Sequence, residues 1–299
     1  MFPKAERLVD LFCGGLDVAI NAPYPAIWAN DKETALIEMY RYFHRTKPTT
    51  VMEKLRATFE EFGLRPMERL YYENGQNKEA YLRMRAAYNE SHDPLVLFAL
   101  LASSFNHQLR FNQQGKFNMP FGAWGKSHYN PVLEKNLKLF LERLSSLNIE
   151  WSNKDFRELE GRIRPEDFVY GGPLYTLGNA VYSGSWDGQR DLQAFLDRLS
   201  NRGIRWALSN VLEHDQTRSG LADWAGKYFI HRLSWNYHNA SYQKKVRARM
   251  AGQVVLITNY RRLRPISVAR LRRPSRGRGF FPRFFPGCHS FPLYFRGES

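Results

Sequence analysis

Hydrophobic residues change their spacing along the chain, and the changes predict strands alternating with helices. Short apolar runs typical of buried strands lie at 8–12, 26–29, 168–170, 204–209, 228–233 and 254–260. Apolar residues at helical spacing predict amphipathic helices at 34–43, 130–146 and 189–201. This alternation indicates an α/β fold with a mostly parallel sheet, whose ligands bind at the carboxyl ends of the strands. That edge would carry Gly14, Asp31, Gly171 and Asn210.

The segment from 44 to 107 lacks strand-like alternation and predicts a helical insertion. Its last part, LVLFALLASSF, is apolar on nearly all faces, so we expect a buried helix. Residues 109–122 follow, with two alternating segments on either side of the polar loop 112–115, which ends on Gly115. This pattern is typical of a β-hairpin, and its polar side chains are of the kinds that contact bases and phosphates. A solvated hairpin without a ligand explains the same pattern.

The first 31 residues form the pattern of a nucleoside-binding βαβ unit. An apolar run leads into Cys13-Gly14-Gly15, a helical segment follows, and a second apolar run ends at Asn30-Asp31. Glycines allow the backbone to approach a ligand, and an acid after the second strand can accept hydrogen bonds from both ribose hydroxyls. A plain tight turn, with Phe12 and Cys13 as packing residues, is the alternative.

The net charge of +15 and a pI of about 9.9 favour a polyanionic partner, first of all nucleic acid. The charge is uneven, because residues 261–299 hold ten arginines and a single glutamate. These residues also contain five prolines and no hydrophobic period, which predicts a disordered basic tail. Such a composition could also come from an out-of-frame reading. The body of the chain is therefore only mildly basic.

Several classes of protein are excluded by composition. Two cysteines cannot form a disulfide framework or a cysteine-rich metal site, and the eight histidines lack metal-ligand spacing. The sequence contains no apolar run of transmembrane length and no signal-peptide pattern. We expect a soluble, cytoplasmic, monomeric protein without a metal ion and without a membrane partner.

Together these segments resemble the Dam-type, D12 class DNA adenine-N6 methyltransferases, the phage members most closely. FPKAERLVDLFCGGL resembles the S-adenosylmethionine motif of that family, in the phage variant where Leu follows the second Gly. Asp31 in WANDKETALIEMY matches the acid that holds the cofactor ribose, and RFNQQGKFNMPFG matches the hairpin that enters the duplex. FVY, NAVY, DLQAFLDRLSNRGI, ALSNVLEH and VLITNY match the second half in order, so the resemblance extends to Tyr260.

The resemblance implies a class I methyltransferase (Rossmann-like) sheet with an inserted helical target-recognition subdomain. The cofactor-binding half would be 1–43, the recognition subdomain 44–147, the catalytic half 148–260 and the tail 261–299. The implied cofactor is S-adenosylmethionine, the implied partner is double-stranded DNA, and the implied target is adenine, often within GATC. The implied cofactor-binding residues are Phe12, Gly14, Asp31, Phe156 and Gly172, and the implied DNA-binding residues are Arg110, Asn112, Asn118 and Lys126.

The catalytic motif of the family, Asp-Pro-Pro-Tyr, corresponds here to Gly172-Pro173-Leu174-Tyr175. The lone pair of adenine N6 is delocalised into the ring, so the nitrogen is a poor nucleophile. In the family the Asp carboxylate and a backbone carbonyl accept hydrogen bonds from N6, and the Tyr stacks on the flipped base. Gly172 has no carboxylate, so we expect methyl transfer by this chain to be impaired.

Two further departures concern binding. The family's Gly-Lys segment, which contacts the cofactor carboxylate upstream of the first strand, is not found ahead of Arg7. Lys126 stands where the family has an arginine that reads guanine, and an ammonium group cannot form the same bidentate contact. The nearest acids in sequence are Asp167, Asp187 and Asp17. Asp167 precedes its predicted strand and so lies at the wrong end of it, and Asp187 lies beyond a long loop.

Three interpretations of the whole sequence remain open. The chain is an active methyltransferase with an unusual catalytic motif, a non-catalytic DNA-binding protein on the same scaffold, or a frame-damaged gene product. The missing carboxylate favours the second and third interpretations over the first, because an acceptor that touches the reacting atom contributes directly to the rate.

Overall fold

The computed structural model describes residues 3–64, 75–122, 130–173, 188–214, 217–218, 220–237 and 252–261 of the 299-residue chain. These residues belong to two compact units. The first unit contains 3–13, 22–32 and the described residues from 154 onward, and the second contains 14–21 and 33–153.

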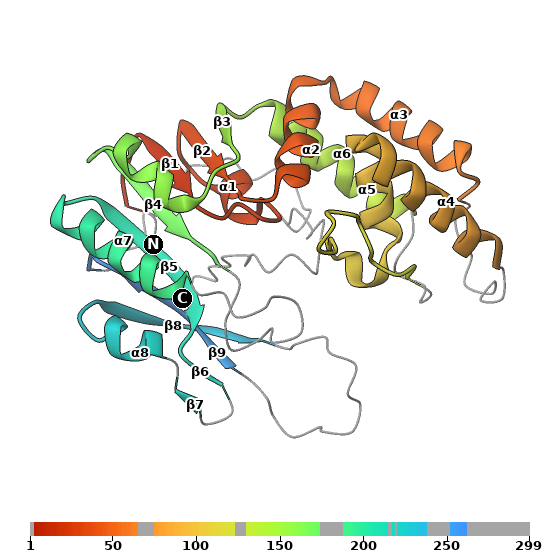
Figure 1. Ribbon diagram of the computed structural model, residues 1–299. Helices are drawn as coiled ribbons and strands as arrows, with labels where there is room; N and C mark the ends of the chain where they lie inside the picture. The colour runs from red at the N-terminus through yellow and green to blue at the C-terminus, as the bar shows by residue number, and fades with distance from the viewer. Residues whose placement is uncertain are drawn as a thin grey trace. The chain divides into compact units, whose positions relative to one another are not determined.

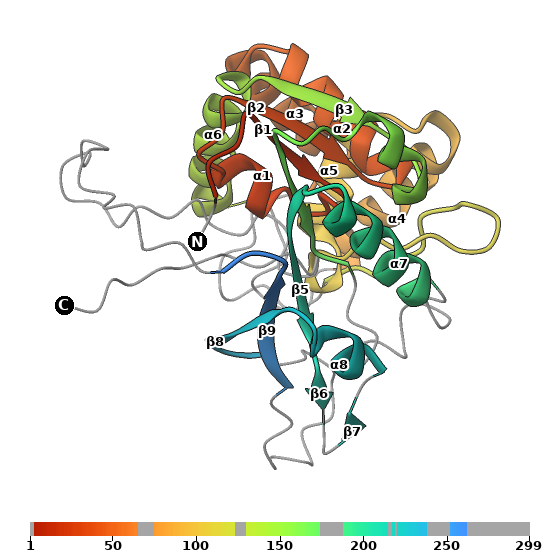
Figure 2. The same ribbon diagram turned by 90° about the vertical axis from the view of Figure 1, so that its left-hand side faces the viewer.

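The first unit is built on a sheet with the hydrogen-bonded strand order β2-β1-β4-β5-β9-β8 (Figures 1 and 2). The strands are β1 (Arg7–Asp10), β2 (Ala26–Asn30), β4 (Asp167–Gly171), β5 (Arg205–Val211), β8 (Phe229–Tyr237) and β9 (Gly252–Thr258). β2, β1, β4 and β5 are parallel, whereas β9 is antiparallel to both of its neighbours. A small ribbon of β6 (Glu213–His214) and β7 (Thr217–Arg218) follows β5. The predicted α/β class with a mostly parallel sheet is confirmed.

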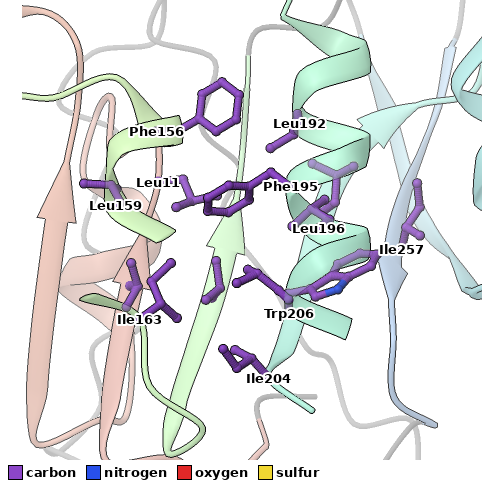
Figure 3. Packing of buried hydrophobic residues seen from close by; sticks show 14 of the residues in the cluster. Leu11, Phe156, Leu159, Ile163, Leu192, Phe195, Leu196, Ile204, Trp206 and Ile257 are labelled. Carbon is purple, nitrogen blue, oxygen red and sulfur yellow. The ribbon is translucent and has the colours of Figure 1, made fainter. Parts of the chain in front are cut away.

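Two helical segments cover one face of this sheet, the 3-10 helix η2 (Phe156–Arg162) and α7 (Gln189–Asn201). α7 presents Leu192, Phe195, Leu196 and Leu199 at helical spacing, and all four side chains are buried. They pack with Trp206 of β5 and Ile257 of β9 in one apolar cluster (Figure 3). The short helix α8 (Gly220–Ala225) adds Leu221 and Ala225 to the same cluster.

The second unit is mainly helical. Its elements are α1 (Asp17–Asn21), α2 (Thr34–Arg45), α3 (Pro48–Glu61), α4 (Gly75–Ser91), α5 (Pro94–Ser103), the 3-10 helix η1 (Phe105–His107), α6 (Pro131–Ser145) and the strand β3 (Ile149–Ser152). The start of α5 is set by Asp93, whose carboxylate accepts hydrogen bonds from the N–H groups of Leu95 (2.7 Å) and Val96 (3.2 Å). As predicted, α5 is buried nearly all round, with α2, α3 and α4 packed against it.

The described part of the segment 44–107 contains helices and a single isolated β-bridge, which agrees with the predicted helical insertion. The domain boundaries at 43, 147 and 260 stay predictions. The catalytic-motif loop beyond Pro173, the segment around Lys126 and the tail beyond Arg261 lie outside the described residues.

Three local predictions were wrong. The sequence from Asn148 to Phe156 predicts a strand followed by a loop, but Asp155 caps the 3-10 helix η2 in a capping box with Glu158, and Phe156 is the first residue of that helix. Asn210 was placed in a loop after its strand but lies within β5, buried between neighbouring strands. β8 runs to Tyr237, past the predicted end at 233, because β9 pairs with it again at Asn236 and Tyr237, beyond an irregular stretch that follows Arg232.

Candidate functional site

The parallel strands of the first unit end at one edge of the sheet, and the residues beyond these ends form the candidate site. In a parallel sheet this edge leaves room for a ligand between the strands and the connections that follow them. Phe12, Asp31 and Gly172 lie one or two residues beyond the ends of β1, β2 and β4 respectively. Three residues predicted from sequence are therefore at the expected edge.

Phe12 and Asp31 are brought together by a backbone hydrogen bond. The N–H group of Cys13 donates to the carbonyl oxygen of Asn30 at 2.7 Å, so the residue after Phe12 is bonded to the residue before Asp31. Both side chains are half-buried. An aromatic residue and an acid that follow two adjacent parallel strands suit the base and the ribose of a nucleoside.

Phe156 supports the ring of Phe12 at the candidate site. Its side chain is buried, with its ring centroid 5.4 Å from that of Phe12 and 5.5 Å from that of Phe195 (Figure 3). Before it in the chain, Asp155 binds the guanidinium group of Arg157, and this hydrogen bond holds the pKa of the Asp155 carboxyl below its usual value. The start of η2, which carries Phe156, is thus fixed by several polar contacts.

Gly14 belongs to the second unit and adopts a φ of +44°. Side chains are disfavoured in this region, so glycine is required for the turn itself. The hydroxyl group of Tyr40, from α2, donates a hydrogen bond of 2.9 Å to the Gly14 carbonyl oxygen. The conformation accounts for the glycine, and its contact with a cofactor stays a prediction.

Two hydroxyl groups lie beside Gly172, the position that corresponds to the Asp of the family motif. A Cβ atom on Gly172 would lie 3.1 Å from Cε1 and 3.4 Å from Oη of Tyr170, and 3.6 Å from Oγ of Ser209. These two hydroxyls are hydrogen-bonded at 2.8 Å, and both side chains are buried. Pro173 is buried, whereas Tyr175 lies outside the described residues.

Asp167 cannot replace the missing carboxylate, because it is the first residue of β4 and Gly171 is the last. At about 3.3 Å per residue this places the two roughly 13 Å apart, at opposite edges of the sheet. The carboxylate of Asp167 also accepts hydrogen bonds from Arg7 Nε (3.0 Å), Arg7 Nη2 (2.8 Å) and the N–H group of Arg164 (2.8 Å). The predicted position of Asp167 at the wrong end of its strand is confirmed, and Asp187 lies outside the described residues.

The second unit contains the predicted hairpin. The N–H group of Asn112 donates to Lys116 O at 2.9 Å, and the N–H group of Asn118 donates to Arg110 O at 3.0 Å. Asn89 of α4 anchors one arm, since its side-chain oxygen accepts a 2.7 Å hydrogen bond from the Phe117 N–H group. The hairpin is therefore attached firmly at its base.

The predicted DNA-binding side chains on this hairpin are engaged within it. Arg110 donates through Nε to Asn118 Oδ1 (2.8 Å) and through Nη2 to Asn118 O (2.9 Å). Asn112 Oδ1 accepts hydrogen bonds from the N–H groups of Gln114 (3.0 Å) and Lys116 (2.9 Å). These contacts give the loop its shape, as an Asx turn does.

The tip of the hairpin, residues 113–116 with the sequence Gln-Gln-Gly-Lys, is exposed. Two amides can pair with base edges and an ammonium group can pair with a phosphate. These tip residues are among the polar residues of the predicted hairpin, but the hairpin residues predicted to bind DNA were Arg110, Asn112 and Asn118. Lys126 lies outside the described residues.

The part of the chain that the structure describes contains no cluster of three or more His, Cys, Asp or Glu residues arranged to hold a metal ion. None of the described helices combines the length and the apolar character needed to cross a membrane.

Sequence analysis missed three residues at the candidate site: Asn30, Tyr170 and Ser209. Asn30 was noticed only as the neighbour of Asp31. Tyr170 and Ser209 are 39 residues apart, and no spacing rule links their hydroxyl groups. Only the parallel pairing of β4 with β5 brings them together.

Known proteins similar to this chain include DNA-modifying enzymes. The Streptococcus sanguinis modification methylase StsI is 33% identical over 273 residues, which are 87% of this chain and 40% of that protein. The type II methyltransferase M.FokI of Planomicrobium okeanokoites is 34% identical over 271 residues, which are 87% of this chain and 40% of that protein. The DNA N-6-adenine-methyltransferase of Escherichia phage P1 is 27% identical over 221 residues, 70% of this chain and 27% of that protein. The chain thus spans about 40% of the length of the first two relatives.

The profile of one protein family, described as D12 class N6 adenine-specific DNA methyltransferase, matches residues 1–246. This match covers the candidate cofactor edge, the hairpin and the segment around Gly172. The sequence resemblance is therefore confirmed, and the chain belongs to the D12 class of N6 adenine-specific DNA methyltransferases.

Proposed function

We propose that this chain binds S-adenosylmethionine and duplex DNA, and that its methyl transfer to adenine N6 is impaired by the glycine at position 172. The proposed target is an adenine within a GATC-like site. Residues 1–43 and 148–260 would form the methyltransferase domain and 44–147 the target-recognition subdomain. The basic tail would add contacts to phosphates, and the protein would act as a monomer in the cytoplasm.

Support for S-adenosylmethionine comes from the chemistry of the edge formed by β1 and β2. The half-buried carboxylate of Asp31 fits the ribose hydroxyls, and the half-buried ring of Phe12, backed by Phe156, fits the adenine. The cofactor supplies an electrophilic methyl group when bound. Asp31 and Phe12 would orient the nucleoside part, and no metal ion is needed for this chemistry.

The single observation that supports impaired methyl transfer is the environment of Gly172. Catalysis in this family depends on an acceptor for the N6 protons, so that the lone pair becomes available to the methyl group. At the end of β4, a backbone carbonyl, that of Gly172 or of Pro173, can accept a hydrogen bond from one of the two N6 protons. The neighbouring hydroxyls of Tyr170 and Ser209 are bonded to each other and carry no negative charge. Tyr175 would still stack on the flipped base.

The hairpin supports a second candidate function, that of a non-catalytic DNA-binding protein. Its base is anchored by Asn89, its loop is shaped by Asn112, and its tip exposes two glutamines and a lysine. None of these features depends on the catalytic motif. A chain that binds DNA without modifying it would compete for the same sites as its active relatives.

Cofactor binding tests the proposal directly. We expect isothermal titration calorimetry to detect S-adenosylmethionine binding to the parent protein, and Asp31→Ala to weaken it by about tenfold or more, because two charge-assisted hydrogen bonds are lost. Asp223→Ala, which removes an exposed acid on α8 of the same unit, is the control and should leave the affinity unchanged. A parent protein that binds DNA but no cofactor would favour the second candidate function.

The hairpin tip is tested by DNA binding. We expect Lys116→Ala to weaken binding to a GATC-containing duplex. The slope of the logarithm of the binding constant against the logarithm of the salt concentration (the salt slope) should become shallower by about 1, since one phosphate contact is lost. Lys138→Ala on α6 removes another exposed lysine of the same unit and serves as the control. Equal effects of the two substitutions on the salt slope, measured by fluorescence anisotropy, would exclude a specific role of the tip.

A further inference from the structure

Four hydrogen bonds join Asn30, the last residue of β2, to two separate loops of the first unit. Its side-chain nitrogen donates to the carbonyl oxygens of Leu11 (3.0 Å) and Lys154 (3.0 Å). Its side-chain oxygen accepts from the N–H group of Lys154 at 3.1 Å, and its own carbonyl oxygen accepts from Cys13 at 2.7 Å. The side chain is 1% exposed.

The two loops held by Asn30 are the ones that carry the aromatic residues of the candidate cofactor site. Leu11 immediately precedes Phe12. Lys154 precedes the capping residue Asp155, which starts the 3-10 helix that begins with Phe156. Through the two loops, one amide fixes the spacing of two rings whose centroids are 5.4 Å apart.

This arrangement requires an amide. Two carbonyl oxygens need a donor and one N–H group needs an acceptor, and both must come from a side chain of this length. Aspartate offers no donor, leucine offers neither, and glutamine is longer by one methylene. Because the groups are buried, each lost partner leaves a polar atom without compensation from water.

We propose that Asn30 is a positioning residue for the cofactor, which holds the Phe12 and Phe156 loops at the spacing that fits the adenine, while Asp31 beside it binds the ribose. The proposal rests on the proposed binding of S-adenosylmethionine. The family motif around Asp31 explains the acid that binds the ribose, whereas this proposal gives a separate role to the neighbouring Asn30. Asn30 itself makes no contact with the cofactor in this scheme.

The chain offers a matched control in Asn259, at the other edge of the same sheet. Its side-chain nitrogen donates to Ile204 O at 2.8 Å and to Ser200 Oγ at 3.2 Å, and its side-chain oxygen accepts from the Trp206 N–H group at 2.9 Å. Asn259 thus also donates two hydrogen bonds and accepts one, at the start of β5, away from the carboxyl ends of the parallel strands. It is half-buried, whereas Asn30 is buried, so replacing either asparagine should lower stability, and Asn30 the more.

The test compares Asn30→Ala with Asn259→Ala by thermal melting and by calorimetric titration with S-adenosylmethionine. We expect both variants to melt at lower temperature, but only Asn30→Ala to raise the Kd for S-adenosylmethionine, by about tenfold. If Asn30→Ala does not melt cooperatively, Asn30→Leu replaces it, because this variant nearly keeps the size of the side chain and adds no charge but loses the donated and accepted bonds.

The outcomes separate the inference from the proposed function. If the parent protein binds the cofactor and the folded Asn30 variant binds it within about twofold of the parent, the positioning role is wrong while the proposed function stands. Equal loss of affinity in both asparagine variants would also overturn the role, because it would reflect general destabilisation. A parent protein without measurable binding would overturn the proposed function, and this inference with it.

Discussion

Gly172→Asp is expected to raise the rate of methyl transfer from S-adenosylmethionine to adenine by about 100-fold or more. The added carboxylate accepts a hydrogen bond from N6 in the transition state, and acceptors or donors of this kind contribute about 10²–10³ in rate. The variant should also gain protection of GATC-containing DNA from a methylation-sensitive nuclease. Transfer of a labelled methyl group to duplex DNA measures the effect directly.

The substitution must be accommodated by Tyr170. A Cβ atom at position 172 would approach Tyr170 Cε1 to 3.1 Å, and the Tyr170 hydroxyl is held by Ser209 at 2.8 Å. The phenol ring must therefore shift by a few tenths of an ångström, which should lower the melting temperature slightly. Gly172→Ala introduces the same Cβ atom without the carboxylate and is the matched control.

The expected pattern is a gain of activity in the Asp variant and none in the Ala variant, with similar melting temperatures. If Gly172→Asp folds and binds both cofactor and DNA, yet transfers no methyl group, the missing carboxylate does not explain the impairment. The replacement of the second proline of the motif by Leu174 would then become the main candidate.

Much of the fold could be predicted because single elements had strong periodicity. The range predicted for α7 agrees with the structure, since Leu192, Phe195, Leu196 and Leu199 form one uninterrupted apolar face. Strand ends were harder, because they depend on the partner strand. β5 continues through Asn210 to Val211 since β9 pairs with it there, and a polar residue inside a strand resembles a loop in the sequence.

The candidate site was predicted in position but not in detail. Phe12, Asp31 and Gly172 follow strand ends, which are visible in the apolar pattern. The role of Asn112 was not predictable, because a polar hairpin residue is equally suited to bind DNA or to accept the N–H groups of its own loop. Hydrogen bonds between distant segments, such as those of Asn30 with Leu11 and Lys154, exist only after the chain has folded.

Asp167→Ala is expected to destabilise the protein strongly, with a loss of about 3–5 kcal/mol in the free energy of unfolding. The side chain of Asp167 is 3% exposed and that of its partner Arg7 is 17% exposed, so the substitution leaves a poorly solvated guanidinium group without its carboxylate. Arg7 also lies over the ring of Trp28, at 5.0 Å from its centroid, together with Arg162 at 4.6 Å. Two positive groups over one ring would then lack the negative charge beside them.

Thermal melting should show a decrease on the order of 10 °C for Asp167→Ala. Glu160→Ala is the control, because Glu160 and Arg198 form an ion pair of similar geometry (2.8 Å) in the same unit but with 25% and 51% exposure. Exposed pairs contribute about 0–1 kcal/mol, so this variant should melt close to the parent. Equal decreases in the two variants would contradict the role of burial. A loss of methyl transfer in Asp167→Ala without destabilisation would contradict its assignment to structure, because Asp167 lies at the edge of the sheet opposite to Gly172.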